Sequence, residues 1–354
     1  MIKREEKLVA KLEKNNMYSK KAILAKTLLA KLQNTSEEAY IFIHKSMDGD
    51  CIGSSVGLCE VIRNLGFKAS VISGEKIQDC MGFLKIENHV KLILEKAEYE
   101  DIKTDLVIAV DCAEASRMGD VGSIFDTSEN RVIIDHHHVS VENSDSNFIV
   151  PEASSASELA FMVSKELAKI CGKEINEIVT PFAAQLFLTG IITDTGRFSY
   201  SNTRPETLVA ASELMELGGS ISSSMFWFYD WKTKEELLVS SAATALARFD
   251  CDGKIASVVV KEELFEKYNA KVDQIGEVVA RLRDVDGVYA AFVLRELGDG
   301  KVRVNLRSHE PFDCLALASQ FGGGGHLRAA GCTVEGDIDE VREEIVKRAI
   351  ELLK

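Results

Sequence analysis

The sequence predicts an α/β protein, in which an N-terminal domain with a mostly parallel sheet flanked by helices is joined by a connector to a smaller C-terminal α/β domain. Short apolar runs without polar alternation, typical of parallel strands buried on both faces, alternate with helical stretches in the first part of the chain. A second series of strand and helix patterns occupies the last third. The length of 354 residues suits two domains of ordinary size.

The elements of the N-terminal domain follow from spacing along the chain. Residues 1–35 carry Lys, Glu, Leu and Ala at helical spacing and predict a helical extension. A helix is expected at about 54–65, with Gly66 as its C-terminal cap. The strands expected in this domain lie at 39–44, 68–73, 105–111 and 131–135. We place the domain at 1–220.

Residues 221–247 mix aromatic and charged side chains and predict a helical connector. The second domain is expected at 248–354, where a Gly-Asp-Gly turn at 298–300 joins two strands and a four-glycine loop precedes a final helix. The strands and the final helix expected there are 255–260, 288–297, 301–308 and 338–353, respectively.

Composition limits the possible functions. The net charge of −14 opposes tight binding to long duplex DNA, which depends on Lys and Arg neutralising phosphates. The N-terminal segment has no apolar signal region, and no run is long enough to cross a bilayer. The eight cysteines form no C-x-x-C pair, so reduced thiols and simple packing are expected, for Cys51 and Cys112 as well. These observations predict a cytoplasmic protein.

A first motif, His44-x-x-x-Asp48-x-Asp50, stands where a strand ends and a helix is about to begin. Loops after parallel strands project into the crevice where α/β sheets bind ligands. One imidazole and two carboxylates suit Mn²⁺ or Mg²⁺ better than Zn²⁺, because oxygen-rich sets favour harder ions. An Asx-turn with a helix N-cap explains the same residues equally well.

Three further motifs add acidic and imidazole groups at the ends of predicted elements. Asp111 ends a buried strand, three histidines at 136–138 follow another, and Asp194 follows an apolar helix. Five of the seven histidines lie at His44, in this triplet and at His326, whereas packing or solvated histidines would be scattered. Six residues from these four motifs could together hold two ions that share a carboxylate. They are His44, Asp48, Asp50, Asp111, His136 and Asp194.

A fifth motif lies in the second domain, where four glycines at 322–325 precede His326 and Arg328. Glycines let backbone N–H groups approach an anion closely, and the two side chains could add charge-assisted bonds. A flexible connector is the alternative. We favour a phosphate site, whose candidate residues are Arg307, Ser308, Gly323, Gly324, Gly325, His326 and Arg328.

These five motifs, in this order, resemble the DHH/DHHA1 phosphoesterases over roughly residues 38–335. Length and motif order are most similar to the small NrnA-type oligoribonucleases of that family, which also dephosphorylate 3′-phosphoadenosine 5′-phosphate. Met47 stands where many members have proline, and His138 adds a third histidine. Neither difference removes a ligand. The resemblance makes 1–220 the catalytic domain and 248–354 the substrate-binding domain.

The resemblance also implies a role for each residue. His44 and Asp48 would hold one ion, and Asp50, His136 and Asp194 the other. As catalytic residues, Asp111 would bridge the ions and His137 would face the substrate phosphate. A hydroxide shared by two divalent cations, Mn²⁺ before Mg²⁺, is expected to attack phosphorus.

Other functions remain open at this point. A phosphodiesterase for pApA or cyclic dinucleotides, and a RecJ-like single-strand exonuclease, share the motifs. A nucleotide sensor without activity is disfavoured because all six ligands are present. The expected partner is short RNA or a nucleotide, with no membrane and no long duplex DNA, and a homodimer is conceivable.

Overall fold

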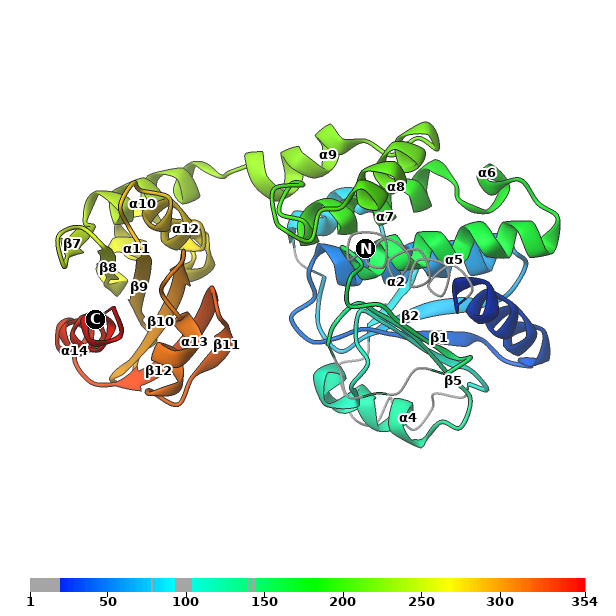
Figure 1. Cartoon of the computed structure of the whole chain (residues 1–354), viewed down its shortest axis with the longest axis horizontal. Helices are drawn as coiled ribbons and strands as arrows, with labels where there is room; N and C mark the ends of the chain where they lie inside the picture. Colours follow the sequence, from blue (N-terminus) through cyan, green and yellow to red (C-terminus); the bar gives the residue numbers. More distant parts are fainter. Residues whose placement is uncertain (1–19, 78, 93–103, 139–140, 142–143, 354) are drawn as a thin grey trace, which may run out of the picture. The chain divides into compact units, whose positions relative to one another are not determined.

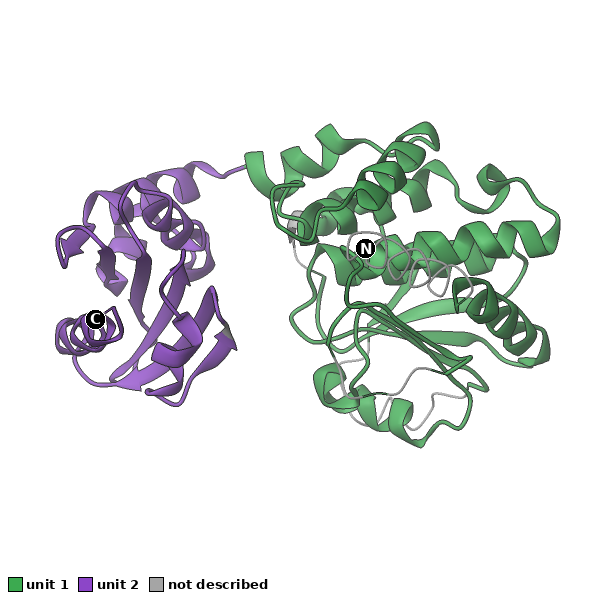
Figure 2. Cartoon of the chain, viewed as in Figure 1, with its two compact units in different colours: residues 1–231 green, residues 232–354 purple. Residues whose placement is uncertain are grey.

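The computed structural model describes residues 20–353 except 78, 93–103, 139–140 and 142–143, together with all side chains in these ranges but those of residues 79, 80 and 326. The chain divides into two compact units, Met1–Trp231 and Lys232–Lys354 (Figure 2). The boundary lies inside the range predicted as a connector. Most of the predicted N-terminal extension, residues 1–19, is outside the described residues, and a helix covers 20–34.

The first unit contains a six-stranded sheet in which every neighbouring pair is parallel. The strand order is β3-β2-β1-β4-β5-β6, so the direction of strand addition reverses between β1 and β4. Such a switch point opens a crevice beyond the carboxyl ends of the two strands. The strands are β1 (Ala39–Phe42), β2 (Ala69–Ser73), β3 (Val90–Leu92), β4 (Val107–Val110), β5 (Arg131–Asp135) and β6 (Asn147–Ile149).

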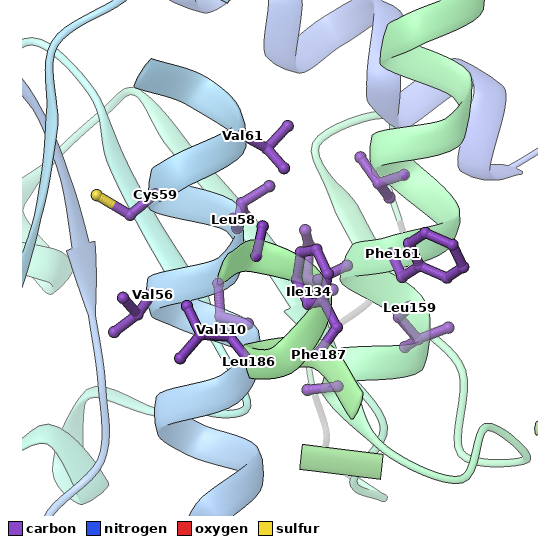
Figure 3. Packing of buried hydrophobic residues seen from close by; sticks show 14 of the residues in the cluster. Val56, Leu58, Cys59, Val61, Val110, Ile134, Leu159, Phe161, Leu186 and Phe187 are labelled. Carbon is purple, nitrogen blue, oxygen red and sulfur yellow. The ribbon is translucent and has the colours of Figure 1, made fainter. Parts of the chain in front are cut away.

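Helices cover both faces of this sheet (Figure 1). On one face, α2 (Gly49–Asn64), α5 (Ala156–Cys171) and α7 (Pro181–Asp194) share a core with alternate strand residues such as Ile108 and Val110. Figure 3 shows this packing of apolar side chains. On the other face, the intervening strand residues pack beneath η2 (Ala115–Val121) and α4 (Gly122–Thr127). Burial on both faces explains why the strands are continuously apolar.

The helix α2 begins at the first motif. Asp48 is its N-cap, and the Asp48 Oδ1 atom accepts hydrogen bonds from the backbone N–H groups of Asp50 and Cys51 at 3.0 and 2.9 Å. Such a cap satisfies backbone donors that the first helical turn leaves free. The helix therefore starts about five residues earlier than predicted. Its first turn carries Asp50 toward the carboxyl ends of the strands.

Smaller elements complete the first unit. A π-helical turn at Phe226–Asp230 continues directly from α9 and gathers aromatic residues, with Trp227 stacked on Phe83 at 5.6 Å between ring centroids. No helix in the described ranges is long and apolar enough to span a bilayer. The remaining elements are η1 (Asp79–Leu84), α6 (Ile175–Ile178), α8 (Pro205–Glu216) and α9 (Ile221–Met225).

The second unit has a mixed six-stranded sheet of order β11-β12-β10-β9-β8-β7, in which only β8 and β9 are parallel. The four-glycine segment expected as a loop includes β11, which pairs with β12, so that part of the prediction was wrong. The strands are β7 (Arg248–Asp250), β8 (Ile255–Val260), β9 (Ala290–Glu296), β10 (Lys301–Ser308), β11 (Gly324–His326) and β12 (Ala329–Glu335).

Helices pack on both faces of the second sheet. The apolar side chains of α13 and α14 form one core with β9 and β10. Val239 and Ala243 of α10 join α11 and α12 in the other core, so α10 belongs to the second unit although it lies within 221–247. The helices are α10 (Lys234–Ala245), α11 (Glu262–Tyr268), η4 (Val272–Ile275), α12 (Val278–Arg283), α13 (Cys314–Ser319) and α14 (Ile338–Leu352).

Candidate metal centre

The carboxyl ends of the central strands bring the acidic and imidazole side chains together. His44 follows β1, Asp111 follows β4 and His136 follows β5, and these strands are neighbours in the sheet. Helices supply the other two groups, since Asp50 lies in the first turn of α2 and Asp194 is the last residue of α7. Residues far apart in sequence therefore meet at the switch point of the sheet.

His136 lies among three carboxylates. The His136 Nε2 atom is 3.4 Å from Asp111 Oδ1, 3.7 Å from Asp194 Oδ2 and 3.8 Å from Asp50 Oδ2. Donor atoms of Asp50, His136 and Asp194 all lie within 4.8 Å of one another. One imidazole cannot hydrogen-bond three carboxylates through one nitrogen, so the arrangement calls for additional positive charge.

The Asp50 carboxylate is held by the start of α5. It accepts hydrogen bonds from the backbone N–H groups of Ala156 and Ser157 at 2.7 and 2.9 Å. A helix N-terminus favours negative charge, which fixes a carboxylate that is only 1% exposed. Gly190 of α7 leaves room for this arrangement, because a Cβ there would lie 2.7 Å from Asp50 Oδ1.

Asp111 and His44 face each other with donor atoms that suit a cation. The His44 Nδ1 atom lies 2.7 Å from the carbonyl oxygen of Lys45, which only accepts, so Nδ1 carries a proton. His44 Nε2 then faces Asp111 Oδ2 at 3.2 Å. Asp111 adopts a left-handed backbone conformation, with φ of 61°, and its buried Oδ1 faces His136 Nε2 at 3.4 Å. These residues fit a divalent cation.

Burial and mutual repulsion perturb the charges of the cluster. Burial, together with the charges of Asp111 and Asp194, raises the pKa of Asp50. Burial, reinforced by Asp111 and Asp48 and opposed by His136, raises the pKa of Asp194 to about 6. Burial opposes ionisation of Asp111 too, but hydrogen bonds with His136 and His44 lower its pKa to about 2. Clustered carboxylates of this kind are typical of metal and catalytic sites.

Divalent metal binding should release protons from this cluster. Burial disfavours the imidazolium form of His136, but the Asp111 hydrogen bond and the charges of Asp50 and Asp194 outweigh it and raise the pKa of His136 to about 10. Without an ion, His136 therefore carries a proton, which it must lose before it can bind a metal ion. Because raising the pH removes this competitor, Mn²⁺ affinity should increase between about pH 6 and 9, by up to roughly tenfold per pH unit for each proton released.

Calorimetric Mn²⁺ titrations at pH 7 in two buffers of different ionisation enthalpy measure the number of protons released. We expect the observed heats to differ in proportion to the buffer enthalpies. Equal heats in both buffers, or an affinity independent of pH, would show that the ion does not displace a proton from His136.

One predicted ligand, Asp48, lies outside the close groups of donor atoms in the described part of the chain. Asp48 is exposed, caps α2 through Oδ1 and belongs to none of the close donor groups among the described residues. Its charge nevertheless contributes to the raised pKa of Asp194 and to that of His44. His138 is exposed, and no role follows from its position.

Asp135, for which the sequence indicated no role, positions His137. The Asp135 Oδ1 atom lies 2.8 Å from His137 Nδ1 and accepts hydrogen bonds from the backbone N–H groups of His136 and His137. Asp135 is fully buried, whereas His137 is about one-third exposed. This bond engages Nδ1 and leaves Nε2 as the ring nitrogen open to other interactions. An acidic residue ending an otherwise apolar strand was the available signal.

Most of the predicted phosphate-binding residues of the second unit lie on β10 and β11, which flank β12, whereas Gly323 and Arg328 lie just outside the strands. Strand register places His326 beside Ala329, and Ala329 beside Arg307. The Arg307 side chain is half-buried and donates to the carbonyl oxygen of Leu306. The side chain of His326 lies outside the described part of the structure. These strands therefore bring the backbone of the glycine-rich segment close to Arg307.

Two other predicted residues are already engaged. Ser308 Oγ donates to the carbonyl oxygen of Phe312 at 2.8 Å. Arg328 Nη1 donates to the same carbonyl group at 2.7 Å, and Arg328 Nη2 pairs with Glu310 at 3.1 Å. Gly323 and Gly325 pack closely on β12, because a Cβ on either would lie 2.4 or 2.5 Å from a backbone oxygen, whereas Gly324 faces open space.

The fold and the cluster define a two-unit α/β protein whose parallel sheet carries a carboxylate and histidine centre suited to divalent cations. Residues 38–191 match the family model described as the DHH family, N-terminal domain, and residues 252–354 match the DHHA1 domain. The chain belongs to the DHH/DHHA1 family of phosphoesterases, hydrolases that act on phosphate esters.

Two curated relatives span nearly the same length as this chain. It is 30% identical to the bifunctional oligoribonuclease and PAP phosphatase NrnA of Thermus thermophilus, over 89% of this chain and 90% of the relative. It is 27% identical to the Bacillus subtilis protein of the same description, over 87% and 93%. A solved exopolyphosphatase-related protein from Bacteroides fragilis shares the fold, with a TM-score of 0.82, 24% identity and coverage of 92% and 95%.

Proposed function

We propose that this protein is a two-metal phosphoesterase that hydrolyses short oligoribonucleotides and 3′-phosphoadenosine 5′-phosphate. One observation carries the proposal: three carboxylates, those of Asp50, Asp111 and Asp194, converge on His136 within 3.8 Å, and the second oxygen of Asp111 faces His44. The substrates follow the printed names of the two relatives that share about 30% of their residues with this chain over most of its length.

Each donor has a proposed place. His44 and Asp48 would hold one ion, and Asp50, His136 and Asp194 the other. Asp111 would serve both, since its two oxygens face different imidazoles, Oδ2 toward His44 and Oδ1 toward His136. Mn²⁺ is preferred because the set combines oxygen donors with two imidazoles. Ions bound there would lower the pKa of water and stabilise charge on the phosphoryl oxygens.

The protein itself contributes orientation. The start of α5 fixes the Asp50 carboxylate, and Asp135 fixes the His137 ring with its Nε2 free. His137 would donate a hydrogen bond to the phosphoryl group and so favour the charge that develops during attack. The residues of the second unit, above all Arg307, the glycine segment and His326, would bind another phosphate of the substrate.

Substrate length offers a test of this proposal. The net charge of −14 repels the outer phosphates of a long strand, so kcat/KM should fall as RNA lengthens from about two to about twenty nucleotides. Added salt should reduce this fall, because it screens the repulsion. The measurement is kcat/KM on 5′-labelled RNA of about two, five, ten and twenty nucleotides at low and moderate salt.

The same assay should include 3′-phosphoadenosine 5′-phosphate, pApA, pyrophosphate and long single-stranded DNA, each with Mn²⁺ and with Mg²⁺. Hydrolysis of short RNA and of 3′-phosphoadenosine 5′-phosphate is the expected result. A flat or rising length profile would instead favour a RecJ-like exonuclease. Exclusive hydrolysis of pApA would favour a role in dinucleotide turnover.

A further inference from the structure

The Cys51 thiol lies beside two residues of the candidate metal centre. The donor atoms of His44, Cys51 and Asp111 all lie within 4.8 Å of one another, and all three residues are buried. Cys51 directly follows Asp50 in the first turn of α2, but the Asp50 carboxylate is bonded to the start of α5. The two neighbouring residues of this helical turn therefore have different surroundings: Asp50 contacts the start of α5, and Cys51 lies near His44 and Asp111.

The two residues that lie near the Cys51 thiol present donor atoms that suit a cation. Asp111 is only 2% exposed, and its Oδ2 atom faces His44 Nε2 at 3.2 Å while Oδ1 faces His136. His44 presents Nε2 toward Asp111 because its Nδ1 is bonded to the carbonyl group of Lys45. Buried charged groups in proteins are normally paired or bind metal ions, so a carboxylate buried beside imidazole and sulfur donors suits a cation.

We propose that Cys51, His44 and Asp111 form a binding site for soft or borderline divalent ions, such as Cd²⁺, Zn²⁺ and Co²⁺, that competes with Mn²⁺ at the catalytic centre. The inference rests on the proposed metal centre, with which it shares two ligands. Thiolate, imidazole and carboxylate together form a three-ligand set that suits these ions, with a fourth position open to water. Mn²⁺ and Mg²⁺ prefer oxygen donors and have little affinity for sulfur.

The binding step is balanced without any other reactant. The S–H bond of Cys51 breaks, a sulfur–metal bond forms, and the proton leaves to solvent as the divalent ion enters. An ion held in this way occupies His44 and Asp111, which the proposed catalytic pair also requires. Occupancy by Cd²⁺ or Zn²⁺ should therefore exclude the Mn²⁺ pair and inhibit hydrolysis.

Cobalt spectroscopy of the full chain tests the inference directly. A thiolate bound to Co²⁺ gives a charge-transfer band in the near ultraviolet that oxygen and nitrogen donors do not give. We expect this band when Co²⁺ is added to the metal-free protein, and its loss in both C51S and C51A. Cd²⁺ affinity should fall by at least about tenfold in these variants, with a much smaller change in Mn²⁺ affinity.

The matched control is C112S. Cys112 also follows an aspartate of the centre and is fully buried, but its sulfur bonds the carbonyl group of Glu114 and belongs to no close donor group among the described residues. C112S should keep the band. Circular dichroism establishes that each variant is folded. Two different replacements of Cys51 are used so that the result does not depend on a structural effect of one particular substitution.

The outcomes separate this inference from the proposed function. Co²⁺ binding without a thiolate band, or a band that survives in C51S and C51A, overturns the role of Cys51 while the two-metal proposal stands. Absence of both Mn²⁺ and Co²⁺ binding overturns the two together. Loss of the band in the Cys51 variants but not in C112S supports the soft-ion site.

Discussion

Replacing Asp111 with Asn should abolish hydrolysis of every substrate while the chain stays folded. Asp111 is the only carboxylate of the described cluster that lies near both His44 and His136, with distances of 3.2 and 3.4 Å. The amide keeps the shape of the side chain but removes the charge that would be shared by two ions. We expect kcat to fall at least about a thousandfold, equivalent to about 4 kcal/mol.

The control for this variant is Asp105→Asn, just before the opposite end of β4. Asp105 is exposed and accepts hydrogen bonds from Ser36. It lies just before the amino end of β4, whereas the metal centre lies beyond the carboxyl end of this strand. Both variants should be assayed in excess Mn²⁺, with thermal unfolding to verify that they are folded. If Asp111→Asn keeps more than about a tenth of kcat while Asp105→Asn is unaffected, the bridging role is wrong.

Gly53→Val should destabilise the first unit and weaken metal binding together. Helices α2 and α7 cross so closely that a Cβ on Gly53 would lie 2.4 Å from the carbonyl oxygen of Leu186 and 3.0 Å from the backbone nitrogen of Gly190. Backbone atoms cannot rotate away, so the helices must separate. We expect a loss of at least about 3 kcal/mol in the free energy of unfolding and a fall in Tm of roughly 6–12 °C.

This separation should reach the metal centre, because α2 carries Asp50 and α7 carries Asp194. Mn²⁺ affinity, measured at a temperature where the variant is folded, should fall as well. Gly82→Val serves as control, since a Cβ there would meet nothing within 4 Å. Unchanged unfolding of Gly53→Val, or equal destabilisation by both variants, would refute close helix packing as the reason for glycine at this position.

The sequence alone predicted the fold class and named the residues that the structure brings together at the first sheet. Parallel strands buried on both faces leave a continuous apolar signal, and polar groups placed directly after them stand out against it. The histidine triplet after β5 and Asp111 after β4 could therefore be found without coordinates. Short elements such as β3 and β11 could not, because three residues are too few to establish a period.

Only the tertiary structure decided which groups these residues contact. The hydrogen bonds from the start of α5 to Asp50, and from His137 to Asp135, join groups whose partners cannot be inferred from spacing along the chain. Cys51 and Cys112 each follow an aspartate in the sequence and are equally buried, yet only Cys51 reaches His44 and Asp111. The reason is physical: a side chain's direction depends on the helix or turn that carries it and on what packs against it, and these are fixed only when the chain folds.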